Sequence, residues 1–219
     1  AYGTALLASR YGVPPLAALA ATTAGVALMA FVVGRPILRL KGHYLAMATL
    51  GFGTIVYSLV LGTARFGAAD GLSSVPALPL PAGLSVSGAR ADRISNYYVA
   101  WGLVALAMLL LANLVESRVG RALRAIHGAE DAAGSMGVDV ARYKLRTFVL
   151  SAVLAAVGGS FLTHFNGGIG PGEAAVMKSV RYVSIVAVGG MGSLWGTVAT
   201  SLALLAPSGI GRRKLGVLL

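Results

Sequence analysis

The chain has 219 residues, of which 57% are hydrophobic and 11% charged, with a formal net charge of +11. A soluble domain carries about 25% charged residues, so this composition indicates an integral membrane protein. The basic residues lie between apolar runs, which argues against nucleic-acid binding and for a role in membrane orientation. There is no cysteine, which excludes disulfides and thiolate metal sites, and the three histidines are isolated.

Five apolar segments are long enough to cross a bilayer. We expect these spans at residues 16–33, 44–61, 97–115, 145–165 and 183–206. Gly51 and Gly53 interrupt the second span. The last span holds four glycines and stops at Pro207, so we expect a broken or re-entrant helix there. The predicted fold is an all-α integral membrane protein, a polytopic helical bundle forming a single transmembrane domain over residues 1–219.

The basic residues predict on which side of the membrane each polar segment lies. Segments 35–42, 116–146 and 207–219 fall on one side and hold twelve Lys and Arg, whereas the segments on the other side, including 1–13 and 63–96, hold six. The positive-inside rule therefore places the first set in the cytoplasm. The chain starts AYGTALL, without a basic leader or initiator Met, so we expect it to begin inside a longer protein, incomplete at the N-terminus.

Segment 116–146 is strongly polar between two apolar spans and holds four of the seven acidic residues. Its apolar residues recur at spacings of three and four, which predicts one face of an α-helix. These residues are Val119, Leu123, Ile126, Ala129, Ala133 and Met136. Ser117 suits the N-cap and Gly137 the left-handed position after the helix. Gly128 leaves two alternatives open, one rod or two short helices meeting near His127. A polar helix between spans can dock on a soluble partner.

The motif EDAAGSMG in this segment resembles the EAA loop of ABC importer permeases. In that family a short cytoplasmic helix sits in a groove of the ATP-hydrolysing subunit. The resemblance assigns this coupling role to Glu130, Asp131, Ala132, Ala133 and Gly137. Small residues permit close backbone approach, and the glycine turns the chain back to the membrane. The alternative is an ordinary surface helix whose alanines serve helix propensity. We call residues 116–146 the coupling segment.

Glycines in the second and last spans are candidates for helix packing or for a translocation pathway. They are Gly51, Gly53, Gly189, Gly190, Gly192 and Gly196. Residues 44–51 and 182–189 each run from a Tyr to a Gly, a match that either an inverted repeat or chance would produce. VGGMGSLWG lacks the Gly-Lys-Ser/Thr ending of a phosphate loop, so we expect no nucleotide binding there.

Three long stretches resemble the inner-membrane permease of branched-chain amino acid ABC importers. They are RLKGHYLAMATLGFGTIV, GRALRAIHGAEDAAGSMGVDVARYKLRTFVLSAVLAAVGGSF and VGGMGSLWGTV, and the similarity extends over residues 1–207. Thr54 stands where the family commonly has an acidic residue, and FGAADGL lacks the usual Thr-Gly-Gly run. We also expect the family's first spans to be missing. These departures bear on substrate identity more than on family membership.

The resemblance implies a permease subunit in the bacterial plasma (inner) membrane that forms part of the pathway for branched-chain amino acids. It implies a second permease subunit, cytoplasmic ATP-binding subunits and an extracytoplasmic solute-binding protein as partners, and no cofactor. Urea or short amides are the alternative cargo. The rival class is an ion-coupled secondary transporter, which needs ionisable residues inside the membrane, and the predicted spans hold essentially none away from their ends. A purely structural membrane subunit is a third alternative that the sequence leaves open. His43 and His164 lie at span ends and are read as interfacial, and no catalytic constellation marks an enzyme.

Overall fold

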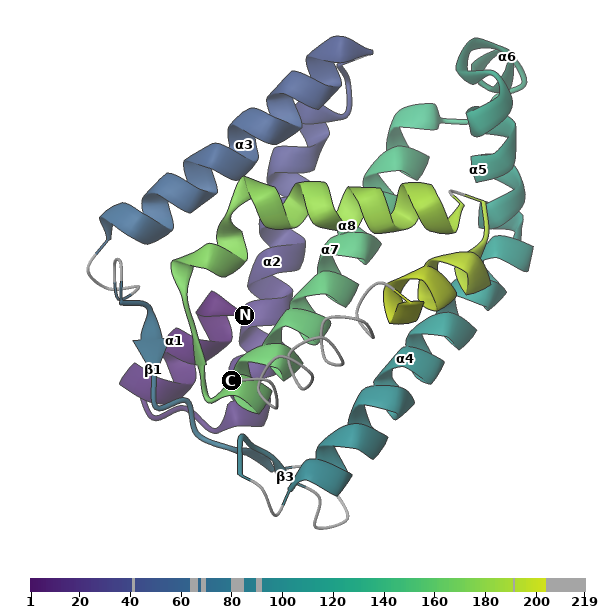
Figure 1. Cartoon of the computed structure of the whole chain (residues 1–219). Coiled ribbons are helices and arrows are strands. Elements are labelled where there is room, and N and C mark those ends of the chain that lie inside the picture. Colours follow the sequence, from purple (N-terminus) through teal and green to yellow (C-terminus); the bar gives the residue numbers. More distant parts are fainter. Residues whose placement is uncertain are drawn as a thin grey trace, which may run out of the picture. The chain divides into compact units, whose positions relative to one another are not determined.

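The structure is a computed structural model and describes residues 1–40, 42–63, 67, 70–79, 85–89, 92–190 and 192–203. It divides into two units, Ala1–Ala174 and Ala175–Leu219, which are described separately. The helices of the first unit are α1 (Tyr2–Arg10), α2 (Pro15–Ile37), α3 (His43–Gly62), α4 (Arg93–Glu116), α5 (Arg118–Gly128), α6 (Glu130–Ser135) and α7 (Val140–Asn166), with a 3-10 helix η3 (Pro171–Ala174) (Figure 1).

Four helices of this unit, α2, α3, α4 and α7, are long and apolar enough to cross a membrane. They confirm the first four predicted spans and the all-α polytopic fold, with longer boundaries. Gly51 and Gly53 do not interrupt α3, which runs unbroken through both. α7 begins five residues before its predicted start at residue 145, so the coupling segment ends inside this helix. The reason is local, because the Asp139 side chain accepts a hydrogen bond from the N–H of Arg142 and caps α7.

The central packing of the first unit joins α2, α7 and the short helix α1, with α2 and α7 side by side along much of their length (Figure 1). Small residues allow this close approach. A Cβ added to Gly34 of α2 would lie 2.9 Å from Phe148 Cδ1 and 3.0 Å from Leu145 Cδ1 on α7. Ala30 on α2 and Ala156 on α7 are also buried. The backbone of one helix therefore lies against large side chains of the other.

Helix α1 was not among the predicted elements, because residues 1–13 read only as a short segment outside the membrane. The structure corrects this by packing α1 against α2 and α7. A chain of hydroxyls, two of them buried, joins the three helices, since Thr4 Oγ1 lies 2.6 Å from Ser160 Oγ and 3.1 Å from Thr22 Oγ1. The Thr22 hydroxyl donates to the carbonyl of Ala18, so Thr4 donates to Thr22 and Ser160 to Thr4. The hydroxyl hydrogens of Thr4, Thr22 and Ser160 are thereby all paired.

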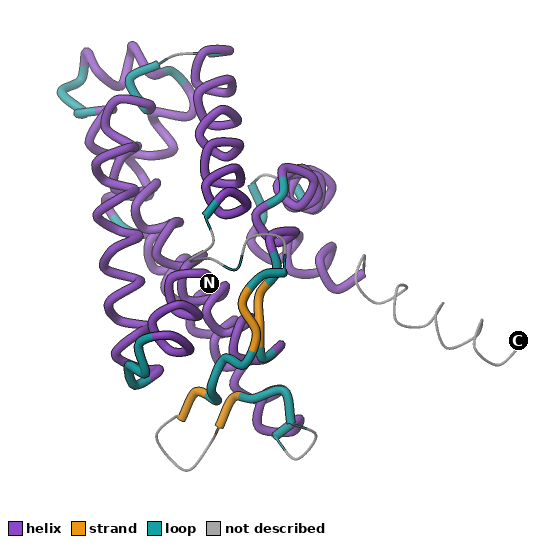
Figure 2. Tube along the Cα trace, turned by 90° about the vertical axis from the view of Figure 1, so that its left-hand side faces the viewer, coloured by secondary structure: helices purple, strands orange, loops and turns teal. Residues whose placement is uncertain are grey.

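Two short antiparallel strand pairs lie near the C-terminal end of α7 (Figure 2). They are β1 (Leu72–Ser73) with β4 (Gly168–Ile169) and β2 (Leu78–Pro79) with β3 (Ser85–Val86). They give structure to part of the predicted loop 63–96, which ends earlier because α4 starts at Arg93.

His164 lies at the end of α7, as predicted, and only 1% of its surface is exposed. Its Nδ1 is 2.8 Å from the carbonyl oxygen of Pro76, which can only accept, so Nδ1 carries the proton. The loop therefore folds over the end of the helix and buries the ring. His43, at the start of α3, is exposed.

The second unit contains α8 (Val176–Gly189) and a helix over Leu194–Ala203. The two are bent by 119° at the break between them, which confirms the predicted broken or re-entrant span. α8 begins seven residues before the predicted start at residue 183. The prediction counted only the apolar part of the helix, because the first turns are polar and carry Lys178 and Arg181. Residues 204–206, Pro207 and the predicted cytoplasmic segment 207–219 lie outside the described residues.

Candidate functional site

The coupling segment forms two helices rather than one rod. Ala129 separates α5 from α6 and has an extended backbone, with φ −159° and ψ 106°. The Ser117 hydroxyl accepts hydrogen bonds from the N–H groups of Val119 and Gly120 at 3.1 and 3.3 Å. Ser117 is therefore the N-cap of α5, as predicted.

The turn after α6 confirms the predicted role of Gly137, which has a φ of +84°. The Val138 N–H donates to the carbonyl of Ala133 at 3.1 Å, and the Gly137 N–H donates to that of Gly134 at 3.0 Å. This pair of bonds is the Schellman motif, which satisfies the last carbonyls of a helix when a left-handed residue follows it. The chain turns here from α6 into α7.

Both neighbouring spans hold the coupling segment through side chains. Arg121 Nη1 donates to the carbonyl of Glu116 at 3.2 Å, and Arg124 Nη2 donates to that of Val115 at 3.0 Å. These two arginines thereby satisfy carbonyls that the end of α4 leaves without helical partners. At the other end, the Glu130 carboxylate of α6 forms an ion pair with the Lys144 ammonium of α7. The contacts of α5 and α6 therefore reach the ends of both α4 and α7.

The predicted coupling residues do not all face outward. Ala133 is only 5% exposed and Ile126 only 6%, so these two residues pack against the chain itself. Asp131, Ala132 and Gly137 are exposed. Met136 follows directly after α6 and is 89% exposed. A docking partner would therefore meet the outer side of α6 and Met136, while Ala133 supports the segment from within.

The glycines named as packing or pathway candidates fall into two groups. Gly51 and Gly53 are exposed on α3, and an added Cβ would meet nothing within 4 Å. In the second unit, a Cβ added to Gly196 would lie 2.0 Å from the carbonyl oxygen of Gly189. These two residues bring two helix backbones into contact, in line with the packing alternative.

Gly190 and Gly192 lie at the break between the two helices of the second unit. Gly190 has a φ of +89°, a conformation that favours glycine, and a Cβ added to Gly192 would meet nothing within 4 Å. The pathway role of all six glycines stays a prediction, and an inverted repeat and chance both stay open as explanations of the match between residues 44–51 and 182–189.

A pocket of about 670 Å³ lies between the C-terminal end of α2 and the start of α7. Its charged lining consists of Arg35, Arg39, Asp139, Arg142 and Arg146. Sequence reasoning used these arginines only to orient the chain in the membrane. The sequence did hold one sign that these arginines could lie together, because the ends of both helices fall on the side of the membrane predicted to be cytoplasmic.

Comparisons with known proteins point to one family. The family model described as branched-chain amino acid transport system / permease component matches residues 1–216. The permease protein LivM of the high-affinity branched-chain amino acid transport system, from Salmonella typhimurium and from Escherichia coli K12, is 33% identical over 94% of this chain and 53% of the relative. LivH of the same system in Salmonella typhimurium is 36% identical over 48% of this chain and 34% of its own length. The chain spans about half the length of the LivM relatives, and no solved structure matches it.

Proposed function

The chain belongs to the permease-component family of branched-chain amino acid transport systems, and from this membership we propose that it forms part of the translocation pathway of an ABC importer for branched-chain amino acids. It is a multi-pass protein of the bacterial inner membrane. In the proposal, separate subunits hydrolyse ATP and this chain carries the solute. The observation that supports ATP coupling most strongly is a polar two-helix segment held to both α4 and α7.

Three partners complete the proposed importer. A second permease subunit supplies the other part of the pathway, cytoplasmic ATP-binding subunits dock on the coupling segment, and an extracytoplasmic solute-binding protein delivers the amino acid. When the ATP-binding subunits close, they displace α5 and α6. The bonds from Arg121 and Arg124 to the end of α4, and from Glu130 to Lys144 of α7, pass that displacement to two spans. The spans then alternate between outward-open and inward-open arrangements.

The position of ionisable residues supports ATP coupling over ion coupling. Transporters driven by ion gradients place such residues within the membrane, where they carry protons or pair with ions. In the four spanning helices of the first unit, every Asp, Glu, Lys and Arg lies within about two turns of a helix end. The proposed energy source is therefore ATP hydrolysed by the partner subunits.

Uptake by the complete transport system tests this function. The full-length permease, its second permease, the ATP-binding subunits and the binding protein are reconstituted in liposomes, and entry of labelled leucine is measured. We expect uptake that needs ATP and the binding protein, is unaffected by collapse of the ion gradients, and is not competed by urea. Uptake driven by a proton or sodium gradient without ATP would support the secondary-transporter class. Uptake of urea but not of leucine would show that the cargo is urea rather than a branched-chain amino acid.

A further inference from the structure

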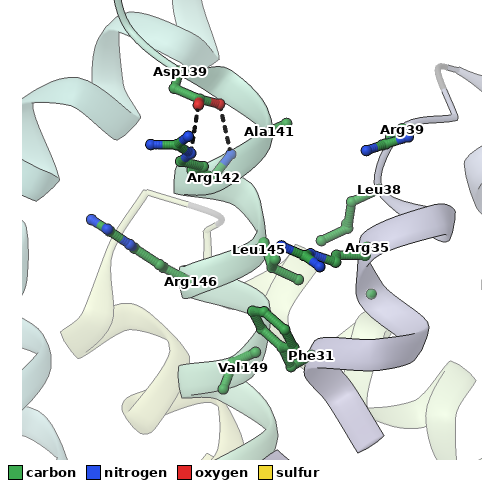
Figure 3. A pocket seen from close by; sticks show the side chains of 11 residues that line it. Phe31, Arg35, Leu38, Arg39, Asp139, Ala141, Arg142, Leu145, Arg146 and Val149 are labelled. Carbon is green, nitrogen blue, oxygen red and sulfur yellow. Dashed lines mark hydrogen bonds and ion pairs between the residues drawn. The ribbon is translucent and has the colours of Figure 1, made fainter. Parts of the chain in front are cut away.

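The pocket between α2 and α7 has a charged end and an apolar end. Figure 3 shows Arg35 reaching from α2 toward α7, Arg39 on the chain just past the end of α2, and Asp139 and Arg142 together at the start of α7. Arg146 extends to the other side of α7 in this view. Leu38 and Leu145 lie among these arginines, whereas Phe31 and Val149 lie about one turn further along the two spans. Beyond the arginines, toward the membrane interior, the pocket lining is therefore apolar.

Positive charge exceeds negative charge in this pocket. Asp139 is its single acidic lining residue, and this carboxylate already pairs with Arg142, whose Nε lies 2.9 Å from Oδ2. The Arg35 guanidinium lies over the ring of Phe31 at 4.8 Å from its centroid. No carboxylate among the described residues forms an ion pair with Arg35 or Arg39. Two guanidinium groups therefore remain to receive an anion.

We propose that this pocket binds the phosphate-bearing headgroup of an anionic phospholipid of the cytoplasmic leaflet, such as phosphatidylglycerol. Arginine suits the role because its planar fork of donors matches the oxygens of a phosphate. Basic pockets between spans on the cytoplasmic side are a recurring form of lipid recognition. The volume of about 670 Å³ falls in the range of about 300–1,000 Å³ that small-molecule sites occupy.

The apolar end of the pocket distinguishes a lipid from a free phosphate ion. An inorganic phosphate would use the arginines but make no contact with Phe31, Leu145 and Val149. A phospholipid satisfies both ends, because its headgroup meets the arginines while its glycerol and first acyl carbons cover the apolar lining. The bound lipid touches both α2 and the start of α7 and therefore stabilises the packing of these two helices by mass action.

Lipid retention by the full-length permease tests the site. The protein is purified in detergent with equal amounts of phosphatidylglycerol and phosphatidylcholine, and retained lipids are counted by native mass spectrometry. We expect selective retention of phosphatidylglycerol, and a loss of about fivefold in its affinity for each of Arg35→Gln and Arg39→Gln. Arg118→Gln is the matched control, because Arg118 is exposed on α5 and does not line the pocket.

A variant with the opposite sign separates binding from damage to the fold. Asp139→Asn removes the carboxylate from the pocket but keeps a side-chain oxygen that can cap α7. We expect it to retain more phosphatidylglycerol than the unchanged protein, an increase that unfolding does not produce. Equal retention of the two lipids, or an Arg35→Gln/Arg39→Gln variant that retains phosphatidylglycerol as well as Arg118→Gln does, overturns the proposal. A second measurement compares the unfolding temperature of the permease in lipid-free detergent with added phosphatidylglycerol and with added inorganic phosphate. We expect phosphatidylglycerol to raise it and phosphate alone not to. If phosphate raises it as strongly as phosphatidylglycerol does, the ligand is a free anion instead.

Discussion

Replacing Gly120 by alanine should push α5 away from the end of α4 and destabilise the coupling segment. Gly120 is buried, and an added Cβ would lie 2.1 Å from the carbonyl oxygen of Val115 and 2.5 Å from that of Leu114. These are backbone atoms, so no side-chain rotation relieves the overlap. Overpacking typically costs about 1–3 kcal/mol, occasionally more. The measurement is thermal unfolding of the purified permease, followed by ATP-dependent leucine uptake in the assembled system.

Gly128→Ala is the matched control, because Gly128 lies in the same helix and an added Cβ would meet nothing within 4 Å. A glycine replaced by alanine at a compatible position stabilises a protein by about 0.4–1 kcal/mol through the unfolded chain. The two variants should therefore move the unfolding temperature in opposite directions. Equal stability of Gly120→Ala and Gly128→Ala would contradict the close approach of α5 to α4.

Replacing Met136 by aspartate should separate the permease from its ATP-binding subunits while leaving the permease folded. Met136 is 89% exposed, and substitutions at such surface positions usually change stability by less than about 0.5 kcal/mol. In the proposed interface the same side chain is covered by the partner, where losing an apolar anchor costs about 2–4 kcal/mol, or roughly 30-fold or more in affinity. The measurement is the amount of ATP-binding subunit that copurifies with the permease from membranes.

Met136→Leu controls for this variant, since it keeps an apolar side chain and should copurify normally. Ala133→Trp is less informative, because Ala133 is buried against the chain itself. That variant should lower the stability of the permease by about 1–3 kcal/mol whether or not a partner docks there. If Met136→Asp retains its ATP-binding subunits and transports at the normal rate, the exposed side of α6 does not contact those subunits.

Local chemistry made some features of the chain predictable. Ser117 and Gly137 are of the residue types that begin and end helices, and both take those roles. Helix α1 could not be inferred in the same way. Its nine residues are too short for a span, and the contact that fixes it joins Thr4 to Ser160, which are 156 positions apart. Sequence spacing carries no sign of that pairing.

The coupling segment shows the same division between local and distant causes. The predicted apolar face is correct for Ile126 and Ala133, which are buried, but not for Ala129 and Met136, which are exposed. The extended backbone at Ala129 breaks the helical spacing that would have aligned these four residues. The pocket depends on distant residues as well, because Arg35 and Arg142 line the same pocket only when α2 packs against α7. Charge counting could place them on one side of the membrane but not beside each other.

Crosslinking from position 136 tests the docking of the coupling segment most directly. The chain has no cysteine, so a single Met136→Cys substitution carries a thiol-linked photoreactive probe to one site in the assembled importer. Ser73→Cys is the control, because Ser73 is exposed on β1, far from α6 in the same unit (Figure 1). We predict a crosslink from position 136 to an ATP-binding subunit and none from position 73. An importer that remains active in uptake, yet crosslinks from position 136 only to lipid or to an extracytoplasmic protein, would contradict the coupling role of this segment.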